Sequence, residues 1–177
     1  MSLRNNHFLI SGNSKLVRIS LLIGLGLILF LFESLIPRPL PWLKPGLAHI
    51  ATLLALFLLG NWAAFFVVVM RVITGSLLLG TLFSPTFALA IGGGIAASFA
   101  MILSKRFFSH IFSIYGISLL GALVHNITQL VLVEFLIVHR LEIFFLIPMM
   151  ALTSVFTGFI VAFFAKLILS KTHLFLT

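Results

Sequence analysis

The polar residues that could do chemistry lie inside long apolar stretches of this sequence. Arg71 stands in the middle of a run that extends from Phe65 to Ser76, away from either end. An ionisable side chain at the centre of a bilayer costs at least about 2.5 kcal/mol on insertion scales unless it is paired or hydrated. Arg71 is therefore either a cation that holds an anionic group of a ligand or one half of a structural ion pair with Glu33 or Glu134.

A second group of polar residues occupies the segment 125–129. His125 and Gln129 are four residues apart, and Asn126 and Gln129 are three apart, so a helix carries all three on one face. An imidazole and two amides offer several hydrogen-bond donors and acceptors to one point. The pattern predicts the polar wall of a pocket. The alternative is interhelical hydrogen bonding, which contributes about 0.6 kcal/mol per pair in membrane bundles.

Glu33 and His49 are two further candidates for the same site. Glu33 precedes Pro37 by about one helical turn, and His49 lies in a short apolar run. A hydrated position near the membrane surface is the alternative for each. We expect no metal ion and no cofactor, because His49 and His125 have no acidic companions at ligand spacing.

The composition places these residues in a membrane protein. Of the 177 residues, 62% are apolar and only 8% are charged, against roughly 25% charged in an average soluble domain. The absence of cysteine excludes disulfides and thiolate metal sites. The absence of aspartate removes the carboxylate clusters that hold Mg²⁺ on diphosphates, so we do not expect an enzyme.

Apolar runs predict an all-α membrane protein, a bundle of about six transmembrane helices. Each crossing of a hydrocarbon core of about 30 Å needs roughly 20 residues. The predicted spans are residues 16–36, 47–59, 63–79, 87–103, 110–138 and 144–169. The second run is short, so it is tilted, partly re-entrant or begins earlier in the chain.

These spans form one membrane domain. Residues 1–15 and 170–177 are its expected cytoplasmic tails, and residues 16–169 are the helical bundle. Small residues at and after Gly92, Gly93 and Gly94 predict close helix packing.

The distribution of basic residues predicts an orientation with both termini in the cytoplasm, N-in and C-in. The inside segments then carry seven Lys and Arg residues and the outside loops carry three: Arg4, Lys15, Arg18, Lys105, Arg106, Lys166 and Lys171, against Arg38, Lys44 and Arg140. The net charge of +8 is thus mainly an orientation signal and a contact with anionic lipid. No nucleic-acid partner is expected.

Prolines shape the loop after the first span. The segment contains Pro37, Pro39, Pro41, Trp42 and Pro45. Proline lacks a backbone donor and disfavours helix at the residue before it. We expect a semi-rigid loop.

Five ordered motifs resemble a known family. They occupy residues 33–37, 44–50, 71–76, 80–85 and 125–129. Over residues 21–164 the sequence is similar to the bacterial membrane family called heptaprenyl diphosphate synthase component I, or the Gx transporter family. That family usually has Asn where this chain has His49.

The resemblance implies a fold and a site. The family is distantly similar to the substrate-binding S components of energy-coupling-factor (ECF) transporters, in which about six helices enclose a small-molecule pocket. The proline loop would be a lid. Arg71, His125, Asn126 and Gln129 would line the pocket, and the protein would lie in the bacterial cytoplasmic (inner) membrane.

Three functions are compatible with the sequence. The first is a transport subunit that binds a small organic molecule, anionic or related to isoprenoids or quinones. The chain has no P-loop, so an ATP-driven energising module or another membrane subunit would supply the energy. The second is a noncatalytic accessory subunit of heptaprenyl diphosphate synthase or of quinone biosynthesis. The third is a purely structural bundle.

Overall fold

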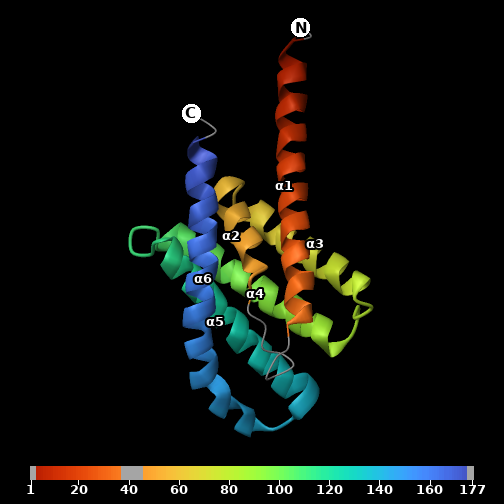
Figure 1. Cartoon of the computed structure of the whole chain (residues 1–177), viewed down its shortest axis with the longest axis vertical. Coiled ribbons are helices and arrows are strands. Elements are labelled where there is room, and N and C mark those ends of the chain that lie inside the picture. The colour runs from red at the N-terminus through yellow and green to blue at the C-terminus, as the bar shows by residue number, and fades with distance from the viewer. Residues whose placement is uncertain (1–2, 37–45, 175–177) are drawn as a thin grey trace.

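The computed structural model describes residues 3–36 and 46–174, and side chains over 14–36 and 46–171. Within these residues the protein is helical and has no strand, which confirms the predicted all-α fold (Figure 1). The helices, including one π-helix (η1) and one 3₁₀-helix (η2), are α1 (Leu3–Leu35), α2 (His49–Leu58), α3 (Asn61–Leu78), α4 (Pro85–Phe107), α5 (Ile114–Val133), η1 (Glu134–Val138), η2 (Leu141–Leu146) and α6 (Ile147–Leu174).

The described residues contain five segments that are long and apolar enough to cross a membrane, so this is a multi-pass membrane protein. They are Ser14–Leu35, Asn61–Leu78, Pro85–Phe107, Ile114–Val138 and Leu141–Lys171. Helix α2 has ten residues and rises only about 15 Å, half the thickness of the hydrocarbon core. Its length fits the expectation that the run 47–59 is tilted or partly re-entrant, and α2 is not among the described helices that are long enough by themselves to cross a membrane.

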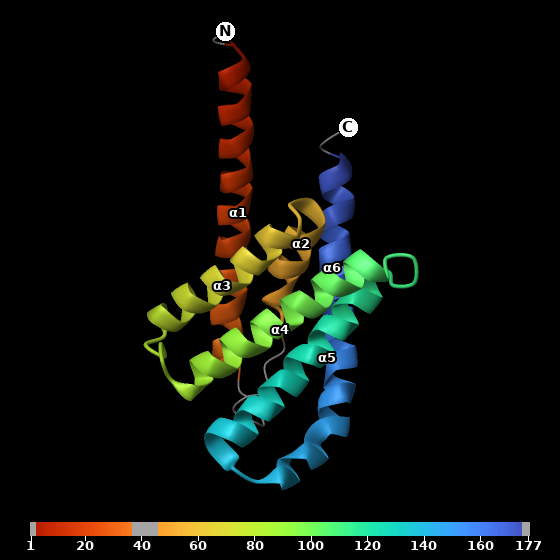
Figure 2. The ribbon, with the colours of Figure 1, turned by 180° about the vertical axis from the view of Figure 1, so that it is seen from behind.

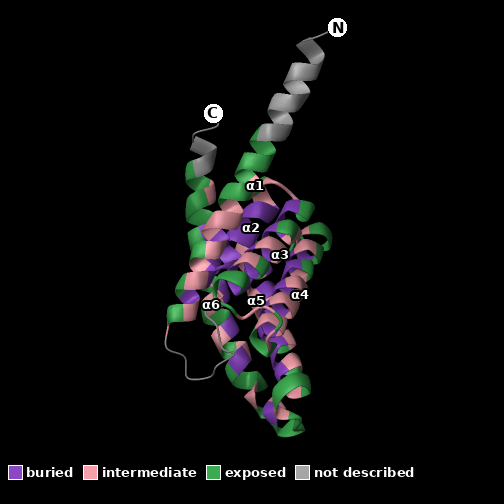
Figure 3. Ribbon diagram, turned by 90° about the vertical axis from the view of Figure 1, so that its right-hand side faces the viewer, coloured by how far each residue is buried: buried purple, intermediate pink, exposed green. Residues whose placement is uncertain are grey.

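Helix α2 is instead the central helix of the fold. Every residue from His49 to Leu56 is buried, and α2 packs against α1, α3, α4 and α6 (Figures 1 and 3). Its side chains form the main apolar cluster with residues such as Val67, Met101 and Val161. A helix that is apolar on all sides is buried on all sides, whether by lipid or by protein. The hydropathy of this run therefore does not distinguish a helix surrounded by lipid from a helix surrounded by protein.

Charged side chains from other helices stabilise the two ends of α2. A Glu33 carboxylate oxygen accepts a hydrogen bond of 2.9 Å from the backbone N–H of Ala48, the residue before α2. At the other end, Lys105 Nζ donates a hydrogen bond of 2.8 Å to the carbonyl of Leu56. Negative charge at a helix N-terminus and positive charge at its C-terminus complement the helix dipole. The short helix is therefore held at both ends by α1 and α4.

Local signals explain where α4 and α6 begin. The Ser84 side chain accepts a hydrogen bond of 3.3 Å from the backbone N–H of Phe87, and Pro85 occupies the first turn of α4, where its missing donor costs nothing. Pro148 lies in the first turn of α6 in the same way.

Three predicted boundaries differ from the observed ones. Helix α1 begins at Leu3 and α6 extends to Leu174, so much of both predicted tails is helical. The predicted span 110–138 begins only at Ile114, and its last turn is the π-helix η1. Hydropathy marks where lipid ends, whereas backbone hydrogen bonding decides where a helix ends.

The ends of the helices follow the predicted alternation across the membrane. The N-terminal end of α1 and the C-terminal end of α6 lie at the same end of the molecule, and the connection between α5 and α6 lies at the other (Figures 1 and 2). Helices α3, α4 and α5 are inclined relative to α1 and α6 (Figure 2). Both termini therefore lie on one side; that this side is cytoplasmic stays a prediction.

Candidate functional site

Five of the six predicted binding residues line one small cavity. They come from α1, α2, α3 and α5, which the sequence separates by up to 96 positions between Glu33 and Gln129. The cavity has a volume of about 10 Å³, which holds about one water molecule. Its lining residues are Phe30, Glu33, Gly46, His49, Arg71, Val72, Ala90, His125 and Gln129. We call it the Arg71 cavity.

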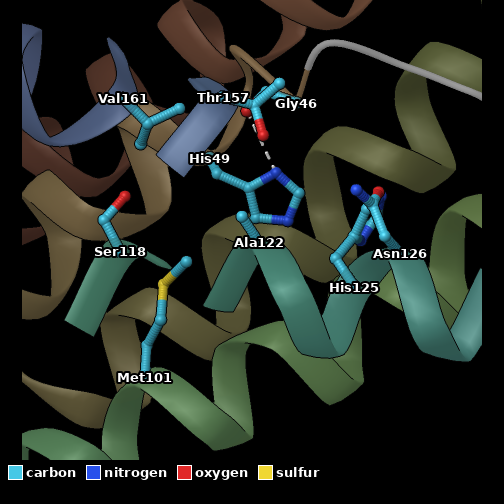
Figure 4. Close-up of a pocket in the computed structure, with 9 residues that line it drawn as sticks. All are labelled: Gly46, His49, Met101, Ser118, Ala122, His125, Asn126, Thr157 and Val161. Atoms are coloured by element: carbon cyan, nitrogen blue, oxygen red, sulfur yellow. Dashed lines mark hydrogen bonds between the residues drawn. The ribbon is translucent and has the colours of Figure 1, made fainter. Parts of the chain in front are cut away.

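The sixth residue, Asn126, lines a neighbouring cavity of about 10 Å³. Figure 4 shows its wall: Gly46, His49, Met101, Ser118, Ala122, His125, Asn126, Thr157 and Val161. His49 and His125 belong to the walls of both cavities. The two imidazoles thus stand between a polar chamber on the α3 side and a less polar one on the α6 side.

Arg71 is almost completely enclosed, with only 3% of its surface exposed. Glycine in α1 provides the space: a Cβ at Gly26 would lie 3.0 Å from Arg71 Cδ and 3.2 Å from the Cβ of Ala51. The carboxylate of Glu33 belongs to the wall of the same cavity. Arg71 Nε has no hydrogen-bond partner among the described residues. Arg71 therefore shares its cavity with an acidic residue, and one of its donors is open toward the described residues.

Glu33, and not Glu134, is the acidic residue at this cavity. Glu33 is buried, and one carboxylate oxygen is engaged by the backbone N–H of Ala48. Glu134 belongs to the π-helix after α5 and is only partly buried. The choice that the sequence left open is thus made by the packing of α1 against α3.

The hydrogen bond of His49 determines its tautomer. His49 Nδ1 lies 3.1 Å from the carbonyl oxygen of Gly46, and a carbonyl can only accept, so Nδ1 carries a hydrogen. In the neutral ring Nε2 is then an acceptor, and it has no partner within the described part of the chain. The dashed line in Figure 4 marks the bond to Gly46.

His125 and Gln129 reach the site because α4 approaches α5 closely. A Cβ at Gly93 would lie 2.8 Å from two atoms of the His125 ring and 3.0 Å from Gln129 Cγ. Gln129 is 1% exposed, and its Oε1 finds no hydrogen-bond donor among the described residues. The predicted close packing at the glycine triplet is confirmed here, and its effect is to make room for two polar side chains.

Asn126 is engaged between helices. Its Nδ2 donates hydrogen bonds of 2.8 Å to Ser154 Oγ and 3.4 Å to the Met150 carbonyl, both on α6. Ser118 adds a bond of 2.8 Å from its Oγ to the Gly158 carbonyl. The amide of Asn126 thus follows the interhelical alternative, although the residue also forms part of a cavity wall.

A third, larger cavity opens beyond the Arg71 cavity. Its volume is about 350 Å³, within the range of small-molecule pockets. We call it the hydroxyl cavity after the serine and threonine side chains in its wall. The described residues in its wall are Phe30, Ser34, Leu35, Ser76, Leu79, Thr81 and Thr86. Phe30 belongs to the walls of both this cavity and the Arg71 cavity.

The structure adds residues that the sequence did not assign to the site. Gly26 and Gly93 make room for the site, Ser154 anchors Asn126, and Lys105 holds α2. Of these residues, only Gly93 belonged to a pattern in the sequence, the glycine triplet that predicted close helix packing.

The predicted lid residues Pro37, Pro39, Pro41, Trp42 and Pro45 lie outside the described residues. No group of three potential metal ligands occurs in the described part of the chain.

The fold matches a solved structure described as the S component of a bacterial ECF transporter. The TM-score is 0.70 at 17% sequence identity, over 94% of this chain and 99% of the other. The chain itself belongs to the heptaprenyl diphosphate synthase component I family, whose model matches residues 22–168. Both resemblances expected from the sequence are confirmed. No curated protein matches the sequence.

Proposed function

We propose that this protein is a substrate-binding subunit of a membrane transport system for a small organic molecule. The observation that carries the proposal is that His49, Arg71 and Gln129 line one cavity and that each has a buried side-chain nitrogen or oxygen without a partner among the described residues. Buried polar groups without partners are costly and rare in proteins. Their presence at one point inside a membrane protein indicates a group that is to be bound there.

The fold supports this assignment. The fold is similar to that of an S component of a bacterial ECF transporter, and the hydroxyl cavity of about 350 Å³ is large enough for part of a small ligand. A noncatalytic role fits the family name "component I". An energising module in the bacterial cytoplasmic membrane would be its partner.

The experiment that tests this function compares two arginine variants. Wild type, Arg71→Ala and Arg106→Ala are purified in lipid nanodiscs, and bound small molecules are identified by mass spectrometry. Arg106 is exposed on α4, so Arg106→Ala removes the same charge away from the cavity. We expect one compound to be retained by wild type and Arg106→Ala and lost from Arg71→Ala. Equal recovery from all three proteins, or from none, contradicts the proposal.

The family name favours a second candidate function, a noncatalytic accessory subunit of heptaprenyl diphosphate synthase. This function would depend on the exposed basic ends of the helices. Arg106 is the residue to test, because Lys105 is engaged with the Leu56 carbonyl and its loss would also disturb α2. If Arg106→Glu abolishes recruitment of a soluble synthase to membranes while Arg71→Ala does not, the accessory function is favoured.

A further inference from the structure

The unpartnered atoms of the Arg71 cavity define the chemistry of the group that fits between them. Arg71 Nε is a donor, whereas His49 Nε2 and Gln129 Oε1 are acceptors, and all three have no partner among the described residues. The three side chains are 3%, 6% and 1% exposed. One donor and two acceptors are complementary to a group that can both accept and donate hydrogen bonds.

The charges in the cavity argue against an anion. Glu33 already opposes the charge of Arg71, and both residues line the same cavity. An anionic oxygen placed here would meet the Glu33 carboxylate and two further acceptors, and like charges in a low-dielectric interior repel strongly. An ammonium group would meet the Arg71 guanidinium for the same reason.

We propose that the Arg71 cavity binds an uncharged hydroxyl group of the ligand. Its oxygen accepts a hydrogen bond from Arg71 Nε, and its hydrogen is donated to His49 Nε2 or Gln129 Oε1. This inference rests on the proposed function and replaces the anionic group that Arg71 alone suggested.

The volumes locate the rest of the ligand. About 10 Å³ accommodates a single oxygen atom with its hydrogens, so the body of the ligand lies elsewhere. The hydroxyl cavity of about 350 Å³ shares Phe30 with the Arg71 cavity. The ligand is therefore an alcohol whose body occupies the hydroxyl cavity and whose head group passes Phe30.

The test uses matched pairs of probes that differ in the head group alone. Geraniol is compared with geranate, and benzyl alcohol with benzoate, by thermal-shift titration of the protein in nanodiscs. We expect both alcohols to stabilise wild type and neither carboxylate to do so. Gln129→Met keeps the shape of the side chain and removes its acceptor. We expect it to weaken alcohol binding about tenfold, the loss of one buried hydrogen bond.

Two further variants keep the result interpretable. His49→Phe retains a ring beside His125 but removes the second acceptor, and we expect a similar loss. Thr128→Val is the matched control, because Thr128 is next to Gln129 in sequence and outside both walls. It should bind alcohols like wild type.

Each other outcome overturns a defined part of the inference. Carboxylate binding that Arg71→Gln abolishes would contradict the uncharged head group and leave the transport function standing. Alcohol binding that both Gln129→Met and His49→Phe leave unchanged would place the hydroxyl elsewhere. Stabilisation by none of the four probes, with no small molecule retained on purification, would contradict the hydroxyl site and the proposed function together.

Discussion

The imidazole rings of His49 and His125 meet edge to face, with their centroids 4.5 Å apart and their planes inclined by 74°. One ring comes from the first turn of the central helix α2 and the other from α5. Gly46 fixes the first ring through a hydrogen bond, and Gly93 leaves just enough room for the second. The position of the rings between two cavities therefore depends on three separate segments of the chain.

The space beside His125 leads to a first prediction. Gly93→Ala places a methyl group 2.8 Å from the His125 ring, so the ring must turn away from His49. We expect a loss of about 1–3 kcal/mol in unfolding free energy, as for overpacked cores, together with weaker ligand binding. Thermal unfolding in nanodiscs measures the first effect. Gly24→Ala is the control, since a Cβ there meets nothing within 4 Å; equal stability of the two variants would refute the prediction.

A second prediction concerns the balance of charge between Glu33 and Arg71. Removing one member of a buried pair costs about 3 kcal/mol or more, because the other charge is left uncompensated. We expect Arg71→Gln and Glu33→Gln each to destabilise strongly. The double variant should lose less than the sum of the two, and a double-mutant cycle measures this coupling. Strictly additive losses would show that the two charges act independently.

A third prediction tests how α2 is held. Lys105→Met keeps the aliphatic chain but removes the ammonium group that contacts the Leu56 carbonyl. We expect a loss of about 1 kcal/mol, measured by thermal unfolding, because the last turn of α2 loses a cation at its C-terminus. Arg106→Met is the matched control, since its side chain is exposed. If both variants unfold alike, the contact does not stabilise α2.

A fourth prediction separates Asn126 from the residues that face the Arg71 cavity. Ser154→Ala removes the 2.8 Å partner of the Asn126 amide and should cost about 0.6–1.7 kcal/mol, the range for interhelical hydrogen bonds. Binding of the alcohol probes should stay within about twofold of wild type, because Ser154 is not among the lining residues of the Arg71 cavity, its neighbour or the hydroxyl cavity. Ser170→Ala, on the exposed end of α6, is the control for stability. Loss of binding without loss of stability would assign Asn126 to the ligand.

A fifth prediction concerns the ring that separates the two cavities. Phe30→Ala should join the hydroxyl cavity to the Arg71 cavity. We expect faster association of the alcohol probes, followed by stopped-flow tryptophan fluorescence, because the head group no longer waits for the ring to rotate. Phe32→Ala is the control, because Phe32 is an exposed ring on the same helix and lines neither of these two cavities. An unchanged association rate would mean that the ring is no barrier.

The sequence by itself determined the class of the protein and named most of the residues of the candidate site. Apolar runs of sufficient length with few charges specify membrane helices, since lipid requires every backbone group to be bonded within the segment. Polar residues that the membrane disfavours marked the site: Arg71 for its cost, and His125 and Gln129 for their helical spacing. The structure brings them together with Glu33 and His49 at one cavity.

Only the tertiary structure decided the place of α2 and the partner of Arg71. Hydropathy is the same for a helix surrounded by lipid and one surrounded by other helices, so ten apolar residues could not reveal that α2 is the centre of the bundle. The choice of Glu33 over Glu134 depends on how α1 packs against α3, a contact between segments far apart in sequence. The hydrogen-bonding atoms without partners among the described residues became visible only in the tertiary structure.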